Sequence, residues 1–106
     1  MQPLFMYKAA ADGEVDVITA FSSDGRISEY DLVTLQDPLA AIPPYDAILL
    51  LAPGRSGDTA LAGALKPLLG KIPVERMREA NLWVSRETDQ LPPAEAARRL
   101  WTAVTR

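Results

Sequence analysis

Cysteine and histidine are both absent from this sequence of 106 residues. Without cysteine there is neither a disulfide framework nor a thiolate metal site. Without histidine there is no imidazole base, so Ser-His-Asp and Cys-His nucleophile systems are excluded, together with nearly all transition-metal sites. We therefore expect a protein that is not an enzyme and that has no catalytic residues, no metal site and no cofactor.

Long apolar runs are also missing. The stretches 47–53 and 61–69 are far shorter than the ~20 residues needed to span a bilayer. The first seven residues lack the charged start and the long apolar middle of a signal peptide. The chain is therefore expected to be either cytoplasmic or a piece of something longer.

Clustered positive charge is absent as well. The formal net charge is −3; residues 1–50 carry eight acidic side chains against two basic ones, and residues 51–106 carry six against nine. The basic residues alternate with acidic ones along predicted helices, whereas nucleic-acid binding needs grouped lysine and arginine. We expect solvated helix faces and no nucleic-acid partner.

Proline, glycine and apolar spacing predict four helices in what we expect to be one domain over residues 1–106. The first is Pro3–Ala11, ended by Asp12 and Gly13. The second follows Asp58 as N-cap and is shortened by Pro67. The third begins near Pro73, and the fourth begins at the Pro92-Pro93 pair. Trp83 and Trp101 lie on the apolar faces of the last two helices and are expected in the core.

Three apolar stretches, 15–21, 32–35 and 45–51, predict strands because they are rich in β-branched and aliphatic residues. Residues 38–42 suggest one helical turn between them. The predicted fold class is therefore α/β or α+β, with a small sheet of about three strands covered by helices. Three strands are few for this length, so we expect the sheet to be completed by another polypeptide or by further sequence.

Three sets of polar residues are candidate sites. Residues 22–25, Ser-Ser-Asp-Gly, suit a chain-reversing turn better than an anion-binding nest, because they lack the glycine spacing of phosphate loops. Residues 54–58, Gly-Arg-Ser-Gly-Asp, are a weak anion-site candidate and are better explained as a surface connection. The acidic residues do not match calcium-loop spacing, and no spacing pairs two carboxylates.

The sequence resembles the substrate-binding proteins of ABC importers for osmoprotectants, which bind glycine betaine, choline, carnitine or proline betaine. The resemblance runs in order along nearly the whole chain. It rests on MYKAA at 6–10, GEVDV at 13–17, AFSSDGRI at 20–27, LQDP at 35–38, PY at 44–45, LKPL at 65–68, GKI at 70–72, MR at 77–78, Asn81 and PAEAA at 93–97.

This resemblance implies a partial periplasmic-binding-protein type II lobe. Members have two α/β lobes with the ligand in the cleft between them, and the chain looks like the C-terminal segment of such a protein. The resemblance further implies a parent protein outside the cytoplasm, either periplasmic or membrane-anchored, and an ABC permease as its partner.

The family holds a quaternary ammonium in a box of aromatic side chains, because a cation that cannot donate hydrogen bonds is held best by ring faces. The resemblance places Phe21 and Tyr45 in that box, and Ser22, Ser23 and Asp24 in the wall beside it. The family commonly has tyrosine at position 21 and threonine at position 23. We expect the isolated chain to bind such ligands weakly or undetectably.

An alternative remains open at this point. The chain is then a truncated domain with a structural role, which dimerises through exposed strand edges and binds no ligand by itself. The apolar run at 48–51 favours that alternative, because it needs cover on both faces. A homo-oligomer is expected in either case.

Overall fold

The computed structural model describes residues 2–106, which divide into two compact units. Unit 1 comprises the described residues up to Thr34 together with Ile72–Arg106, and unit 2 comprises Leu35–Lys71.

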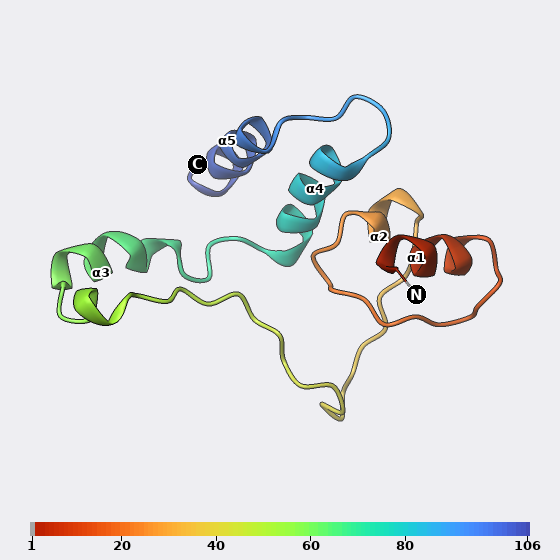
Figure 1. The fold of residues 1–106 in the computed structure, drawn as a ribbon, viewed down its shortest axis with the longest axis horizontal. Helices are drawn as coiled ribbons and strands as arrows, with labels where there is room; N and C mark the ends of the chain where they lie inside the picture. The colour runs from red at the N-terminus through yellow and green to blue at the C-terminus, as the bar shows by residue number, and fades with distance from the viewer. Residues whose placement is uncertain (1) are drawn as a thin grey trace. The chain divides into compact units, whose positions relative to one another are not determined.

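Unit 1 is helical. It contains α1 (Pro3–Ala11), the short α2 (Arg26–Glu29), α4 (Val74–Ser85) and α5 (Pro93–Val104) (Figure 1). Proline is the first residue of α1 and α5, since its fixed φ suits a first turn and its missing N–H is not needed there. Pro73, which was predicted in the first turn of the next helix, instead directly precedes α4 as its N-cap. The Pro3–Ala11 prediction is confirmed in full, whereas α2 was not predicted.

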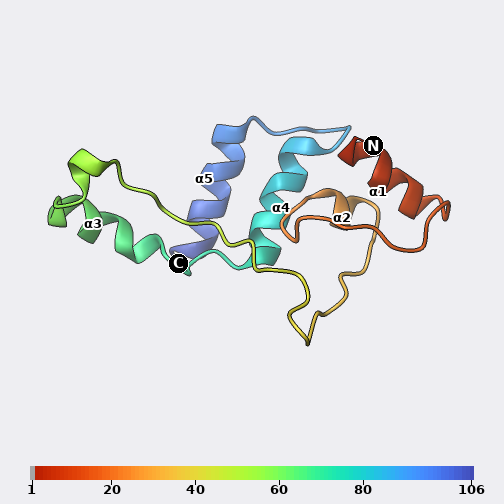
Figure 2. The same cartoon turned by 60° about the horizontal axis from the view of Figure 1, so that its bottom comes forward.

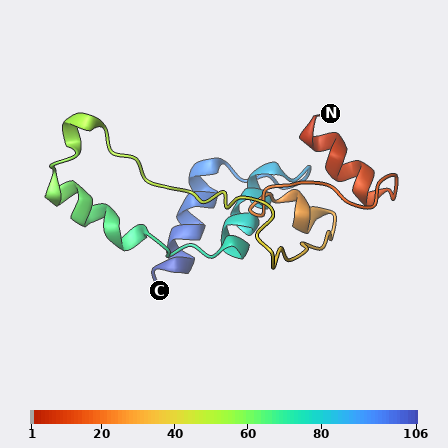
Figure 3. The same cartoon turned by 90° about the horizontal axis from the view of Figure 1, so that it is seen from below.

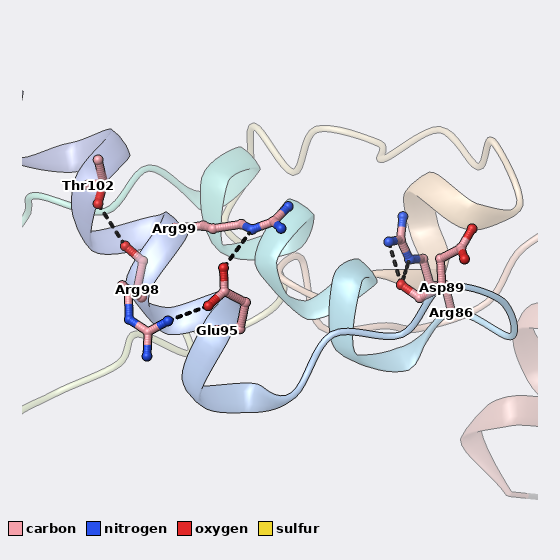
Figure 4. Close-up of polar contacts among 6 residues, drawn as sticks. All are labelled: Arg86, Asp89, Glu95, Arg98, Arg99 and Thr102. Atoms are coloured by element: carbon pink, nitrogen blue, oxygen red, sulfur yellow. Dashed lines mark hydrogen bonds and ion pairs between the residues drawn. The ribbon is translucent and has the colours of Figure 1, made fainter.

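Helices α4 and α5 run side by side in opposite directions (Figure 2). Two residues of the segment that connects them form hydrogen bonds with the C-terminal part of α4 and the residue after it. The Leu91 amide donates to the Trp83 carbonyl at 2.8 Å. The Arg86 guanidinium donates to the Asp89 carbonyl at 2.9 and 2.5 Å (Figure 4). On α5, Glu95 pairs with Arg98 and, at 3.2 Å, with Arg99 (Figure 4).

The buried apolar side chains of the described residues all belong to unit 1. They are Tyr7, Ala9, Ile27, Ala80, Ala96 and Leu100. Ala96 and Leu100 are four residues apart and define the inner face of α5, which directs the neighbouring Trp101 away from it. The prediction that Trp101 is a core residue is therefore wrong, because it is 52% exposed. Trp83 is half-buried, with the Arg99 guanidinium 5.8 Å from its ring centroid.

Unit 2 holds α3 (Thr59–Leu65) between two 3₁₀ turns, η1 (Pro53–Arg55) and η2 (Lys66–Leu68). The predicted N-cap is confirmed, because the Asp58 carboxylate accepts from the Leu61 amide at 2.9 Å. Pro67 ends the α-helix early, as expected, and the chain continues as a 3₁₀ turn. None of the residues in unit 2 is buried.

No strand forms anywhere in residues 2–106, so the predicted α/β class with a three-stranded sheet is wrong for this structure. The stretches 15–21, 32–35 and 45–51 carry no strand arrow in any view, and 45–51 is part of an extended trace between α2 and α3 (Figure 3). Strand propensity favours extended backbone, but a strand also needs a neighbour to accept and donate its hydrogen bonds. No strand within residues 2–106 pairs with these stretches, and Val17, Ile48 and Leu50 remain at least 70% exposed.

The helical turn suggested at 38–42 is also replaced by a different structure. The Asp37 carboxylate accepts from the amides of Ala41 and Ile42 at 3.1 and 2.8 Å, which folds this stretch into a turn without a helix. Across the described residues, no helix combines the length and the apolar character needed to cross a membrane.

Candidate ligand-binding site

A turn forms at residues 22–25, as predicted, and leads directly into α2. Its hydrogen bond spans residues 21–24, so the chain reverses at Ser22 and Ser23 and not at Asp24-Gly25. The Asp24 amide donates to the Phe21 carbonyl at 2.9 Å, which closes the turn. The Asp24 carboxylate in turn accepts from the Arg26 amide at 3.0 Å and from the Arg26 guanidinium at 3.3 Å. Asp24 therefore lies just before the N-cap of α2, which is Gly25, and bonds the first residue of the helix.

Helix α4 holds this 22–25 turn from outside. Arg78 donates from Nε to the Ser22 carbonyl, and Asn81 donates from Nδ2 to the Ser23 carbonyl, both at 2.8 Å. Arg78 and Asn81 are three residues apart, so they project from the same side of α4. Two consecutive carbonyls of the turn thus accept hydrogen bonds from two side chains that lie about one helical turn apart on α4.

Gly25 lets the turn and α4 touch backbone to backbone. A Cβ placed on Gly25 would lie 2.4 Å from the Leu82 nitrogen and 2.9 Å from the Asn81 carbonyl carbon. Atoms this close repel strongly, so any larger residue would push the turn off the helix. The φ of Gly25, −62°, is accessible to every residue type, so backbone conformation does not require glycine here. The lack of space for a Cβ atom does.

Tyr7 of α1 lies beneath the turn and is only 2% exposed. Burial raises the pKa of its hydroxyl to about 12, and the hydrogen bond to the Asp24 carboxylate and its charge act in the same direction. The Arg26 guanidinium stacks over the Tyr7 ring, 5.5 Å from the centroid. Tyr7, Asp24 and Arg26 therefore form one cluster that ties α1 to the start of α2.

The structure brings four of the five predicted site residues together. Phe21, Ser22, Ser23 and Asp24 are consecutive in unit 1, where Phe21 is 60% exposed and Ser23 and Asp24 are half-buried. Tyr45 belongs to unit 2 and is 86% exposed. The arrangement offers an accessible ring on a rigid turn, whereas the Asp24 carboxylate is already engaged by Arg26 and Tyr7.

Two surface hollows lie elsewhere in unit 1. One of about 410 Å³ follows the charged face of α5, around Arg98 and Arg106. The other, about 260 Å³, is apolar and lies between α1 and residues 15–19. Neither is lined by a predicted site residue. Within residues 2–106 no three acidic side chains are grouped so that they could hold a metal ion.

Comparison with known families gives a match over residues 1–103 to the substrate-binding domain of ABC-type glycine betaine transport systems. The chain belongs to this family. Its relatives include the carnitine transport binding protein OpuCC of Listeria monocytogenes serotype 1/2a (strain 10403S) and a protein of the same name from Listeria monocytogenes. Each is 35% identical over 82 residues, which is 76% of this chain and 27% of the relative.

The chain thus spans about a quarter of the length of these glycine betaine-family relatives. No solved structure matches it significantly. The family assignment confirms the resemblance identified in the sequence.

Three side chains that contact residues of the predicted site were missed in the sequence. Tyr7, Arg78 and Asn81 belong to the segments on which the resemblance rests, but they were not predicted to take part in the site. Tyr7 lies 17 positions before Asp24, and Arg78 and Asn81 lie 56 and 58 positions beyond Ser22 and Ser23. The order of the motif segments was the available signal, and it carries no information about which segments meet.

Proposed function

We propose that this chain supplies part of the binding site for a quaternary-ammonium osmoprotectant, such as glycine betaine, choline or carnitine, in the solute-binding component of an ABC importer. The observation that carries the proposal is the family match over residues 1–103. The name of the Listeria relatives, which refers to carnitine transport, supports the same class of ligand.

In this proposal Phe21 and Tyr45 each present an aromatic face to the ligand cation. Both rings are accessible, and a ring face contributes about 0.5–2 kcal/mol to holding a cation, depending on how well water is excluded. Ser22, Ser23 and Asp24 form the wall beside Phe21. The Ser22 and Ser23 carbonyls accept from Arg78 and Asn81 of α4, so this wall is ordered in the absence of ligand.

The chain is proposed to be the C-terminal segment of a two-lobed binding protein. Its coverage of 27% of the Listeria relatives supports that view, because the other walls of the site would then lie in the remaining sequence. The whole protein would act outside the cytoplasm, periplasmic or membrane-anchored, and deliver its ligand to an ABC permease.

A chimera tests the proposal directly. This chain replaces the homologous segment of the Listeria carnitine transport binding protein, and calorimetry measures carnitine binding. We expect Phe21→Ala and Tyr45→Ala each to weaken binding by about 2- to 30-fold, because each removes one ring face. Phe21→Tyr keeps the ring and serves as the matched control, with binding retained.

Two results would contradict this proposal. The first is a folded chimera whose affinity is the same with and without the two rings. The second is tight, stoichiometric binding of glycine betaine or choline by the isolated chain, because a part of a site is expected to bind weakly or undetectably.

Self-association is a second candidate, in which the chain has a structural role and binds no ligand by itself. Edge pairing presupposes strands, and residues 2–106 contain none. The observation that still favours association is the exposed apolar run of unit 2, where Ile48, Leu49 and Leu50 are all more than half exposed. Light scattering decides this point: a monodisperse monomer at high concentration excludes it.

A further inference from the structure

We propose that Arg78 and Asn81 of α4, together with Tyr7 of α1, are positioning residues that set the direction in which the Phe21 ring points. None of them belongs to the predicted site. Their role toward a ligand rests on the proposed function, but their action on Phe21 is a property of the ligand-free chain and is tested as such.

The first step is the hold that α4 has on the peptide groups directly after Phe21. A side chain's direction follows from its own backbone, and the backbone of Phe21 is continuous with the carbonyls of Ser22 and Ser23. Those carbonyls accept from Arg78 and Asn81 at 2.8 Å each. Hydrogen bonds from a charged donor are roughly twice as strong as neutral ones, which makes the Arg78 contact the firmer of the two.

The second step is the closure of the turn on Phe21 itself. The Phe21 carbonyl accepts from the Asp24 amide at 2.9 Å, and Gly25 then packs against the backbone of Leu82. Phe21 is therefore fixed to a turn that cannot rotate without leaving α4.

The third step is the anchor from below. The buried Tyr7 hydroxyl donates to the Asp24 carboxylate and accepts from the Phe21 backbone amide. Tyr7 thus links α1 both to the residue that closes the turn and to the residue that carries the ring. Replacing it with phenylalanine keeps the packing and removes only these polar links.

Arg78 is suited to positioning and not to ligand contact. A guanidinium repels a quaternary ammonium, so direct contact would weaken binding of such a ligand. Its Nε instead points to the Ser22 carbonyl, where it orders the turn.

The test uses fluorine NMR on the full chain labelled with 4-fluorophenylalanine. The sequence contains two phenylalanines, Phe5 and Phe21, so the spectrum has one reporter signal and one internal reference. The labelled variants are Arg78→Met and Asn81→Asp, which lose the donors at nearly constant size. Tyr7→Phe would add a third phenylalanine, so it is followed unlabelled, by hydrogen exchange of the amides at 22–25. Arg78→Lys retains a donor, and Arg76→Met removes an arginine of α4 whose partner is Glu79 on the same helix.

We expect the donor-loss variants to move and narrow the Phe21 signal and to leave the Phe5 signal in place, at unchanged helical circular dichroism. Hydrogen exchange of the amides at 22–25 should rise about tenfold or more, while Arg78→Lys and Arg76→Met behave like the parent chain. An unchanged Phe21 signal in folded Arg78→Met and Asn81→Asp overturns the inference. The inference is also overturned if Arg78→Lys, which retains a donor, changes the Phe21 signal as much as Arg78→Met does.

The same variants in the carnitine-binding chimera separate this inference from the proposed function. If the parent chimera binds and Arg78→Met weakens binding while Arg78→Lys restores it, both hold. If the parent chimera does not bind but the Phe21 signal responds as described, the proposed function fails and the positioning role stands.

Discussion

Gly25 lies where two backbones come too close for any side chain. We predict that Gly25→Ala lowers the free energy of unfolding by about 1–3 kcal/mol, the usual cost of forcing an extra methyl group into a packed contact. Urea unfolding followed by circular dichroism measures the change. Gly63→Ala is the matched control, because Gly63 is inside α3 with open space around its Cβ position. Alanine there should stabilise α3 by about 0.5–1 kcal/mol. Equal effects of the two substitutions would contradict the close approach.

Tyr7 makes unit 1 sensitive to alkaline pH. Its pKa rises from 10.0 to about 12 in the folded chain, so the protonated hydroxyl is favoured by folding. Its contribution to stability is complete below pH 10 and is lost as the pH rises toward 12, because the unfolded tyrosine ionises first. We predict that the stability difference between the parent chain and Tyr7→Phe shrinks by about 2 kcal/mol over that interval. Urea unfolding at several pH values measures it, and a difference independent of pH would contradict the prediction.

The site illustrates what sequence reasoning can reach at the scale of single residues. The turn at 22–25 was predictable because serine, aspartate and glycine favour turns by local chemistry, although the chain reverses at Ser22 and Ser23 and not at Asp24-Gly25. The contacts of Arg78 and Asn81 with it were not, because they join residues 56 and 58 positions apart and resemble ordinary solvated helix side chains in the sequence.

At the scale of elements, the helices were predictable because their signals are local. Proline at a first turn, an aspartate N-cap and glycine after a helix act within a few residues of each other. The strands were not predictable in the same way, since the pattern at 45–51 gives propensity for extended backbone without supplying a partner. The predicted sheet is absent because no second strand pairs with this stretch.

Asp58 offers a test of the local signal at α3. We predict that Asp58→Ala reduces helicity and costs about 1 kcal/mol, because the Leu61 amide loses its acceptor. Asp58→Asn should preserve the cap, since asparagine caps as well as aspartate. Amide exchange at Leu61 and far-ultraviolet circular dichroism measure both variants. A loss of equal size in Asp58→Asn would assign the effect to the ion pair with Arg55 and not to the cap.

At the scale of the whole molecule, the buried side chains are unevenly distributed. The six buried apolar side chains of residues 2–106 all belong to unit 1, and unit 2 buries none of its residues. Regions with few buried apolar contacts open at low free energy. We predict that amides at 35–57 exchange with solvent faster than those of α4 and α5, as measured by hydrogen exchange with mass spectrometry. Equal protection of the two regions would show that unit 2 is stabilised by contacts outside those described.

The hold of α4 on the 22–25 turn also has a consequence for how the chain tolerates changes in length. The Arg78–Ser22 hydrogen bond closes a loop that spans 56 positions and contains all of unit 2. The entropy of closing a flexible loop grows slowly, by about 0.6 kcal/mol for each doubling of its length. Halving the length of the intervening chain would therefore change the free-energy cost of loop closure by less than about 1 kcal/mol, the typical net contribution of one hydrogen bond. Insertions and deletions in unit 2 can thus accumulate while the turn and α4 still find each other during folding.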